Sequence, residues 1–250
     1  MQTPLRGKRE SQAGLSMAEL LVAMVIVTIV GTMLVASWIS LQRSFAFAQA
    51  KNTARATARD ALARMSSELR AAQPPTDSSI TPFYLLLAPP YVCGETSCVF
   101  YSAYNNSAAA QDGTGRAQLR LTKIWLDKVS WRDTAKTTLY WQRDRNNDRI
   151  FSAAVDGSPL PIATGVVNAA ASVNKPIFTY TILDPYGRFV PGVTNLTSSN
   201  VAYVRSVQIR LVVWAGRWRP YVAVVDGDLS RNPRYIDLTT TVRPRNAGTF

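Results

Sequence analysis

The chain has 250 residues, enough for a short leader, one long helix and a single globular domain with a substantial core. Its 28 lysines and arginines outnumber 16 aspartates and glutamates, and this net charge of +12 favours anionic partners such as nucleic acid, anionic lipid or acidic polymers. The sequence has no histidine, nucleophile elbow, phosphate loop or dinucleotide-binding fingerprint. We therefore expect no enzyme active site, no metal site and no cofactor.

The first element in chain order is an uncharged, mostly apolar run from Leu20 to Gln42. It exceeds the ~20 residues that a helix needs to cross a hydrocarbon core of ~30 Å. A single carboxylate, Glu19, stands immediately before the run. A charge near the bilayer is costly and is normally kept for a partner. We interpret that partner as the positive amino terminus of a neighbouring helix of the same kind.

The residues before this run indicate its orientation. Arg6, Lys8 and Arg9 place positive charge on the amino-terminal side, which predicts a cytoplasmic amino terminus and an exported globular part.

Two competing interpretations of the apolar run stay open. A secretory signal peptide has a shorter apolar region, followed by a small-residue cleavage site such as Val35-Ala36-Ser37. A plain single-pass anchor would leave the positions of Gly14 and Glu19 as a coincidence.

Residues 14–21, Gly-Leu-Ser-Met-Ala-Glu-Leu-Leu, resemble the processing site of type IV prepilins and type II secretion pseudopilins. The resemblance implies a leader over residues 1–14, cleavage after Gly14 by a prepilin peptidase and N-methylation of the new terminus at Leu15. It also implies a pilin-like fold and assembly with other pilin subunits by an inner-membrane platform, with Glu19 as the fifth mature residue. Leu15 departs from the usual phenylalanine at the first mature position.

Residues 42–72 follow as an alanine-rich segment without glycine or proline. Small or apolar residues recur at spacings of three or four, which predicts one buried stripe on an amphipathic helix ending before Pro74. We therefore expect one long helix over residues 15–72. Its first part, residues 15–41, would cross the membrane or form the filament core, and its second part would pack on the globular domain.

Residues 73–117 are rich in prolines and turn residues and are predicted to form a connector. Within it lie Cys93 and Cys98. In an exported domain we expect these two cysteines to form a disulfide that clamps a short loop. Zinc is the alternative, but two cysteines without histidines lack two ligands of a structural site.

Residues 118–250 change to a strand-like period and predict a β-rich globular domain. The fold class is therefore α+β, a long amino-terminal helix followed by a domain with an antiparallel sheet. Strands are expected at residues 118–126, 137–143, 150–153, 177–183, 201–214, 217–225 and 235–243. Residues 178–191 and the late Arg-Asn pair loosely resemble larger minor pilins and J-type pseudopilins, which favours a minor subunit.

Two further segments each have two interpretations. The run from Asp144 to Arg149 begins like a calcium loop, but Arg149 stands where glycine is required and Val155 where glutamate is required, so a solvated turn is expected. Arginines interleaved with aromatic residues near the carboxyl end either form the wet face of a sheet or contact a DNA backbone. The arginines singled out for DNA or anion contact are Arg205, Arg210, Arg217 and Arg219.

The sequence as a whole predicts a non-enzymatic structural subunit, a minor pilin-like protein that primes or caps a type IV pilus-like filament. Such a subunit first resides in the inner membrane and then in a cell-surface filament. A pseudopilin of a type II secretion system shares these features. A DNA-binding minor pilin of a DNA-uptake pilus is also compatible with the sequence, as is a membrane-tethered nucleic-acid-binding module that never polymerises.

Overall fold

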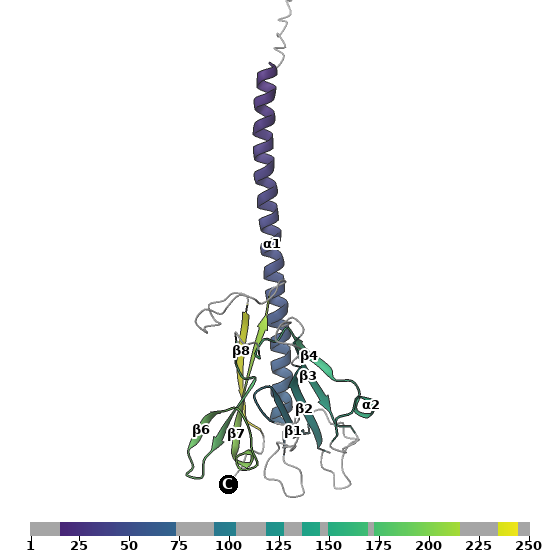
Figure 1. The fold of residues 1–250 in the computed structure, drawn as a ribbon, viewed down its shortest axis with the longest axis vertical. Coiled ribbons are helices and arrows are strands. Elements are labelled where there is room, and N and C mark those ends of the chain that lie inside the picture. Colours follow the sequence, from purple (N-terminus) through teal and green to yellow (C-terminus); the bar gives the residue numbers. More distant parts are fainter. Residues whose placement is uncertain are drawn as a thin grey trace, which may run out of the picture. The chain divides into compact units, whose positions relative to one another are not determined.

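The structure is a computed structural model that describes residues 16–73, 93–103, 119–127, 137–145, 150–169, 173–215 and 235–244. The chain divides into two compact units, one ending at Ala46 and one beginning at Phe47. We describe each unit by itself. Figure 1 gives the element labels used below.

Helix α1 runs from Met17 to Arg70 and confirms the long helix predicted from the sequence. No proline interrupts it, and alanine and leucine, which favour helices, recur along it. The chain leaves the helix through a short bridge between Ala72 and Ser102, and the backbone N–H of Ala103 donates to the carbonyl of Ala71 at 3.2 Å. The carboxyl end of α1 is thereby joined to a strand of the second unit.

Within the second unit, one face of α1 is buried. The buried positions keep the spacing of three or four that predicted the stripe. Phe47, at the start of the predicted stripe, is more than one third exposed, so burial begins later along the helix. The buried apolar residues of this face are Ala58, Ala61, Leu62, Met65 and Leu69.

Four antiparallel strands form a sheet in the order β1-β2-β3-β4. β1 pairs with β2 over its full length, from Ser97 opposite Trp125 to Ser102 opposite Arg120. β4 lies at one edge of the sheet and pairs with β3 through a register shift between Leu139 and Tyr140. The strands are β1 (Ser97–Ser102), β2 (Arg120–Leu126), β3 (Thr138–Arg143) and β4 (Leu160–Thr164), and the short helix α2 (Ala153–Asp156) lies between β3 and β4 in the chain.

A second sheet contains four antiparallel strands in the order β6-β5-β7-β8. Its centre is the long strand β7, which pairs with β5 along one edge and β8 along the other. A 3-10 turn, η3 (Val201–Tyr203), leads into β7. The strands are β5 (Phe178–Leu183), β6 (Phe189–Val193), β7 (Val204–Trp214) and β8 (Tyr235–Val242).

The two sheets and the carboxyl-terminal part of α1 share one hydrophobic core (Figure 1). The sheets are joined where the chain after β4 runs beside β7. Val166 bridges Val213, and the N–H of Val167 donates to the carbonyl of Val212 at 2.8 Å. Asn168 completes this junction, because its amide nitrogen donates to the carbonyl of Arg210 and its amide oxygen accepts from the N–H of Val212, both at 2.8 Å.

The α+β class is confirmed, and five predicted strands coincide with β2, β3, β5, β7 and β8. The strand expected at residues 150–153 is wrong. There the carboxylate of Asp156 accepts the N–H groups of Ser152 and Arg145, and the short helix α2 begins at Ala153 instead. The strand expected at residues 217–225 lies outside the described residues. β1, β4 and β6 were not foreseen, and β1 lies within the segment expected to be a connector.

Candidate functional site

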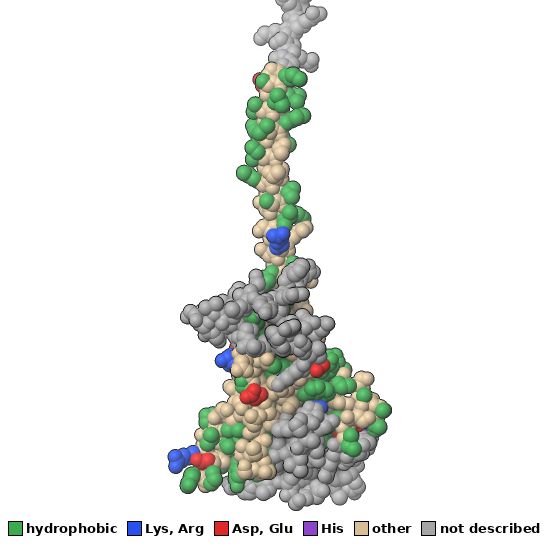
Figure 2. Space-filling view, viewed as in Figure 1, with side chains coloured by type: hydrophobic (Ala, Val, Ile, Leu, Met, Phe, Trp, Pro, Cys, Tyr) green, Lys and Arg blue, Asp and Glu red, His purple; other side chains and the backbone are tan. Residues whose placement is uncertain are grey.

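The amino-terminal part of α1 exposes apolar side chains along its length (Figure 2). One 18-residue window of α1 reaches a mean hydropathy of 2.6, and no part of that window is buried in the structure. The helix is therefore long and apolar enough to cross a membrane. Its large exposed side chains before the second unit begins are Met17, Leu20, Leu21, Val22, Met24, Val25, Ile26, Val27, Ile29, Val30, Met33, Leu34, Val35, Trp38, Ile39, Leu41 and Phe45.

The first turn of α1 carries a reciprocal cap. The backbone N–H of Ser16 donates to Oε2 of Glu19 at 2.8 Å, and the N–H of Glu19 donates to Oγ of Ser16 at 3.3 Å. This is a capping box, which satisfies two donors at the start of the helix. The carboxylate of Glu19 also lies at the positive end of the helix dipole. Gly14 and Leu15, the predicted processing residues, lie outside the described residues.

A buried ion pair anchors α1 to both of the neighbouring strands. Nη2 of Arg143 lies 2.9 Å from Oε1 and 2.9 Å from Oε2 of Glu68, and Oγ of Ser102 donates to Oε2 of Glu68 at 3.0 Å. The side chains of Arg143 and Glu68 are only 14% and 1% exposed. Burial raises the pKa of Glu68 above its ordinary value, while the charge of Arg143 opposes that shift.

Two arginines lie over the indole ring of Trp141. Cζ of Arg64 lies 4.4 Å from the ring centroid and Cζ of Arg143 lies 5.3 Å from it. Cations over an aromatic ring are attracted by its quadrupole. Nε1 of Trp141 and Nε of Arg143 are buried donors without a hydrogen-bond partner in the described structure. The indole is thus held by contacts with cations rather than by a hydrogen bond of its Nε1.

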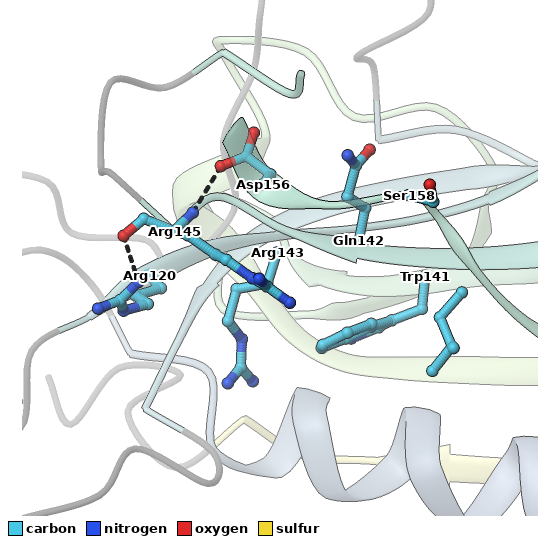
Figure 3. Close-up of a pocket in the computed structure, with 8 residues that line it drawn as sticks. Arg120, Trp141, Gln142, Arg143, Arg145, Asp156 and Ser158 are labelled. Carbon is cyan, nitrogen blue, oxygen red and sulfur yellow. Dashed lines mark hydrogen bonds between the residues drawn. The ribbon is translucent and has the colours of Figure 1, made fainter. Parts of the chain in front are cut away.

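A cavity of about 380 Å³ lies beside these residues (Figure 3). Figure 3 shows Arg143 pointing toward α1 and Asp156 pointing away from it. The backbone of Arg145 links two sides of the cavity, because its N–H donates to Oδ1 of Asp156 at 2.7 Å and its carbonyl accepts from Nη1 of Arg120. The lining residues are Arg120, Trp141, Gln142, Arg143, Arg145, Asp156, Ser158 and Leu160.

Cys93 and Cys98, which were expected to form a disulfide, lie beside each other in the structure as thiols. Both residues are fully buried thiols, and their Sγ atoms lie 3.9 Å apart, against ~2.05 Å for a bonded pair. The turn in which the N–H of Gly94 donates to the carbonyl of Ser97 brings them together. Sγ of Cys93 instead contacts the backbone of Val99, 3.1 Å from its oxygen and 3.2 Å from its nitrogen. Burial raises the pKa of Cys98 well above its ordinary value, so its thiol stays protonated and unreactive.

Lys123 is a buried cation on β2. Its Nζ lies 4.2 Å from the ring centroid of Trp125 and 5.7 Å from that of Phe151. Burial lowers its pKa from the ordinary 10.5 to about 8. The ring of Trp125 stacks in turn on Tyr140 of β3, with centroids 5.6 Å apart. Neither this lysine nor the Glu68–Arg143 pair was foreseen from the sequence, because each acquires its environment from residues on other elements.

Of the four arginines predicted for DNA contact, the structure describes Arg205 and Arg210. Arg210 forms a two-point pair with Asp237, with Nη2 2.5 Å from Oδ2 and Nε 3.0 Å from Oδ1. This hydrogen bonding raises the pKa of Arg210, and its charge is already matched by a carboxylate. Arg205 lies half-buried on β7, and Arg217 and Arg219 lie outside the described residues.

The segment considered as a calcium loop is only partly described. Asp144 is fully buried, and its N–H donates to the carbonyl of Leu121 at 2.9 Å. Residues 146–149 lie outside the described part of the chain. Among the described residues, no three acidic, cysteine or histidine side chains form a group that could hold a metal ion.

Comparison with solved structures finds distant similarities, and one of them is to a pilin. Part of the chain is similar to the type IV-like pilin TTHA1219 from Thermus thermophilus, with a TM-score of 0.27 and 13% sequence identity. The match covers 61% of this chain and 78% of that one. No protein-family profile and no curated protein sequence matches the chain. A function is therefore inferred from the chain's own apolar helix, its predicted processing site and its charges.

Proposed function

We propose that the chain is a non-enzymatic, membrane-inserted structural subunit that assembles into a type IV pilus-like filament through the amino-terminal part of α1. The observation that carries the proposal is the exposed apolar surface between Met17 and Phe45. Such a surface requires a bilayer or other helices around it. A subunit that is first stored in a membrane and then packed in a filament meets both requirements in turn.

The processing-site resemblance supports the same proposal. Cleavage after Gly14 would leave Leu15 as the new terminus, one residue before the cap formed by Ser16. The positive amino group would then lie near the carboxylate of Glu19 or of a neighbouring copy. We propose that the Glu19 carboxylate pairs with the terminus of an adjacent subunit during assembly and that its hydrogen bond with Ser16 holds it near the helix start beforehand.

Two matched variants separate this role of Glu19 from simple helix capping. Glu19→Gln removes the charge but keeps an oxygen that can accept the N–H of Ser16, as in a glutamine capping box. Ser16→Ala removes the hydroxyl cap and keeps the carboxylate. The measurement is the amount of subunit in sheared, purified filaments compared with the amount in membranes.

The proposal predicts that Glu19→Gln remains in the membrane and is absent from filaments, whereas Ser16→Ala still enters them. If Glu19→Gln assembles normally, pairing between subunits through this charge is wrong. If Ser16→Ala fails as completely as Glu19→Gln, helix capping accounts for the effect instead. Both variants keep the apolar run from Leu20 onward, so membrane insertion serves as the internal control.

The priming or capping role belongs to this proposal and draws its support from the loose resemblance to larger minor pilins. A type II secretion pseudopilin would have the same membrane segment and the same Glu19. Immunogold labelling of filaments tests the priming or capping role. A priming or capping subunit is labelled only at filament ends, whereas a subunit of the filament body is labelled along the whole length. The pairing of Arg210 with Asp237 disfavours a DNA-binding subunit that acts through Arg210.

A further inference from the structure

We propose that the cavity at the end of β3 is a binding site for a phosphate group. The site lies between the start of β2, the end of β3 and the loop that contains α2. Its donors are the guanidinium groups of Arg120 and Arg145, and Arg143 lines the cavity between the sheet and α1 (Figure 3). This role is independent of filament assembly, since none of the residues involved belongs to the apolar part of α1.

Arg145 supplies the most accessible charge. Its side chain is exposed, and in the described structure its guanidinium forms no hydrogen bond or ion pair. The group lies against Gly157, with Nη2 3.4 Å from the position that a Cβ atom would take there. Gly157 has a φ of +84°, a conformation that glycine adopts readily. A larger side chain at residue 157 would crowd the guanidinium of Arg145, so glycine at this position leaves room for that group.

Arg120 is held from the opposite side by one hydrogen bond. Its Nη1 donates to the carbonyl of Arg145, which fixes the guanidinium and leaves its other N–H groups available. Arginine presents these donors as a planar fork that matches phosphate oxygens with two parallel hydrogen bonds. The two guanidinium groups are thus connected through the backbone of a single residue, Arg145.

Arg143 is positioned by α1. Its Nη2 is bound by both oxygens of Glu68 at 2.9 Å, yet its buried Nε has no partner in the described structure. The site has three guanidinium groups and two carboxylates, those of Asp156 and Glu68, so its net charge is +1. Both oxygens of Asp156 already accept backbone N–H groups, from Arg145 at 2.7 Å and from Ser152 at 2.8 Å. The carboxylate therefore shapes the loop, and the unmatched positive charge remains with the arginines.

The aromatic residue of the site indicates which part of a ligand it takes. Cζ of Arg64 and Cζ of Arg143 lie 4.4 Å and 5.3 Å from the ring centroid of Trp141, so these two cations already occupy space over the ring that a stacked base would need. The site consequently fits the phosphate itself rather than a nucleobase. That phosphate could be a terminal monoester or free phosphate, or it could be a diester within a larger molecule, and the experiment below includes a probe for each.

The test is isothermal titration calorimetry of the full chain in detergent micelles at constant ionic strength, with inorganic phosphate and with dimethyl phosphate as probes. Constant ionic strength is required because added salt screens exposed charges. We expect saturable binding of at least one probe. Binding of inorganic phosphate alone assigns the site to terminal or free phosphate, and binding of dimethyl phosphate assigns it to diesters.

Arg145→Gln is the principal variant because the wild-type guanidinium holds no other element in place. We expect it to weaken binding about tenfold or more, the equivalent of one charged hydrogen bond. Arg188→Gln is the matched control, since Arg188 lies in the turn between β5 and β6 of the other sheet, where its Cζ is 5.5 Å from the ring centroid of the exposed Tyr186. It should leave the Kd unchanged. The proposal is overturned if neither probe binds, if Arg145→Gln binds as wild type does, or if Arg188→Gln loses binding equally.

Discussion

The substitution Glu68→Ala should destabilise the second unit more than any exposed change on α1. In the structure Glu68 joins α1 to β3 through Arg143 and to β1 through Ser102. The side chain of Arg143 is only 14% exposed, so removing the carboxylate leaves a buried guanidinium without its counter-charge. Breaking a buried ion pair in this way costs about 3–5 kcal/mol. In a domain of about 200 residues, that loss lowers the Tm by roughly 6–20 °C.

Differential scanning calorimetry of the full chain in micelles measures this loss. Asp60→Ala is the matched control, because Asp60 is an exposed carboxylate on the same helix and should change stability by no more than about 0.5 kcal/mol. The double variant Glu68→Ala with Arg143→Ala should lose less than the two single variants together, since it leaves no unpaired charge. Equal effects of Glu68→Ala and Asp60→Ala would refute the reasoning.

The pH dependence of the same pair has a defined sign. Burial raises the pKa of Glu68, so the folded state binds a proton more tightly than the unfolded state does. The protonated Glu68 therefore contributes its full stabilisation below the ordinary pKa of 4.5. That stabilisation is lost as the pH rises through the pKa that Glu68 has in the folded state. The wild type should therefore gain stability relative to Glu68→Gln as the pH falls from neutral toward 4.5, measured by urea unfolding at each pH. A wild type that instead loses stability relative to Glu68→Gln over this range would contradict the assigned direction.

Three further predictions concern other buried polar groups. Lys123→Met should raise the Tm at pH 7. It should also abolish the gain in stability that the wild type shows between pH 8 and 10.5, because in that range the lysine stays protonated only in the unfolded state. A wild type whose stability does not change over this range would contradict the prediction. Cys93 and Cys98 should resist iodoacetamide in the folded chain and both react after unfolding without reductant, as intact mass measures; thiols that stay unlabelled in denaturant would show that they are bonded. Asn168→Ala should cost at least about 2 kcal/mol in urea unfolding, because it removes the partner of two backbone groups of β7, and a loss close to zero would exclude that role.

The helix was predictable because its signals are local. Apolar and small residues at spacings of three or four mark the stripe that packs through Ala58 and Met65, and Ser16 and Glu19 have the spacing of a capping box. Strand β7 was predictable for the same reason, since alternate residues such as Ile209 and Leu211 are buried. In each case the pattern depends on neighbours within a few residues.

Two of the missed strands, β4 and β6, contain local signals that point the other way. β4 includes Pro161, and β6 includes Pro191 followed by Gly192, residues that argue against a strand. Both strands lie at sheet edges, where a missing N–H donor is tolerated. The Glu68–Arg143 pair joins residues 75 positions apart, and no local pattern predicts such a contact. The same holds for the cavity, whose lining comes from separate strands and a loop.

The most direct test of the central claim is intact mass and amino-terminal sequencing of the protein from its native membrane, with Gly14→Val as the comparison. A filament subunit processed at the predicted site begins at a methylated Leu15, and Gly14→Val retains the leader. A wild-type chain that keeps its leader, or one that begins near Trp38, would contradict the account. In that case the exposed apolar helix would be an anchor or a cleaved signal rather than an assembly element.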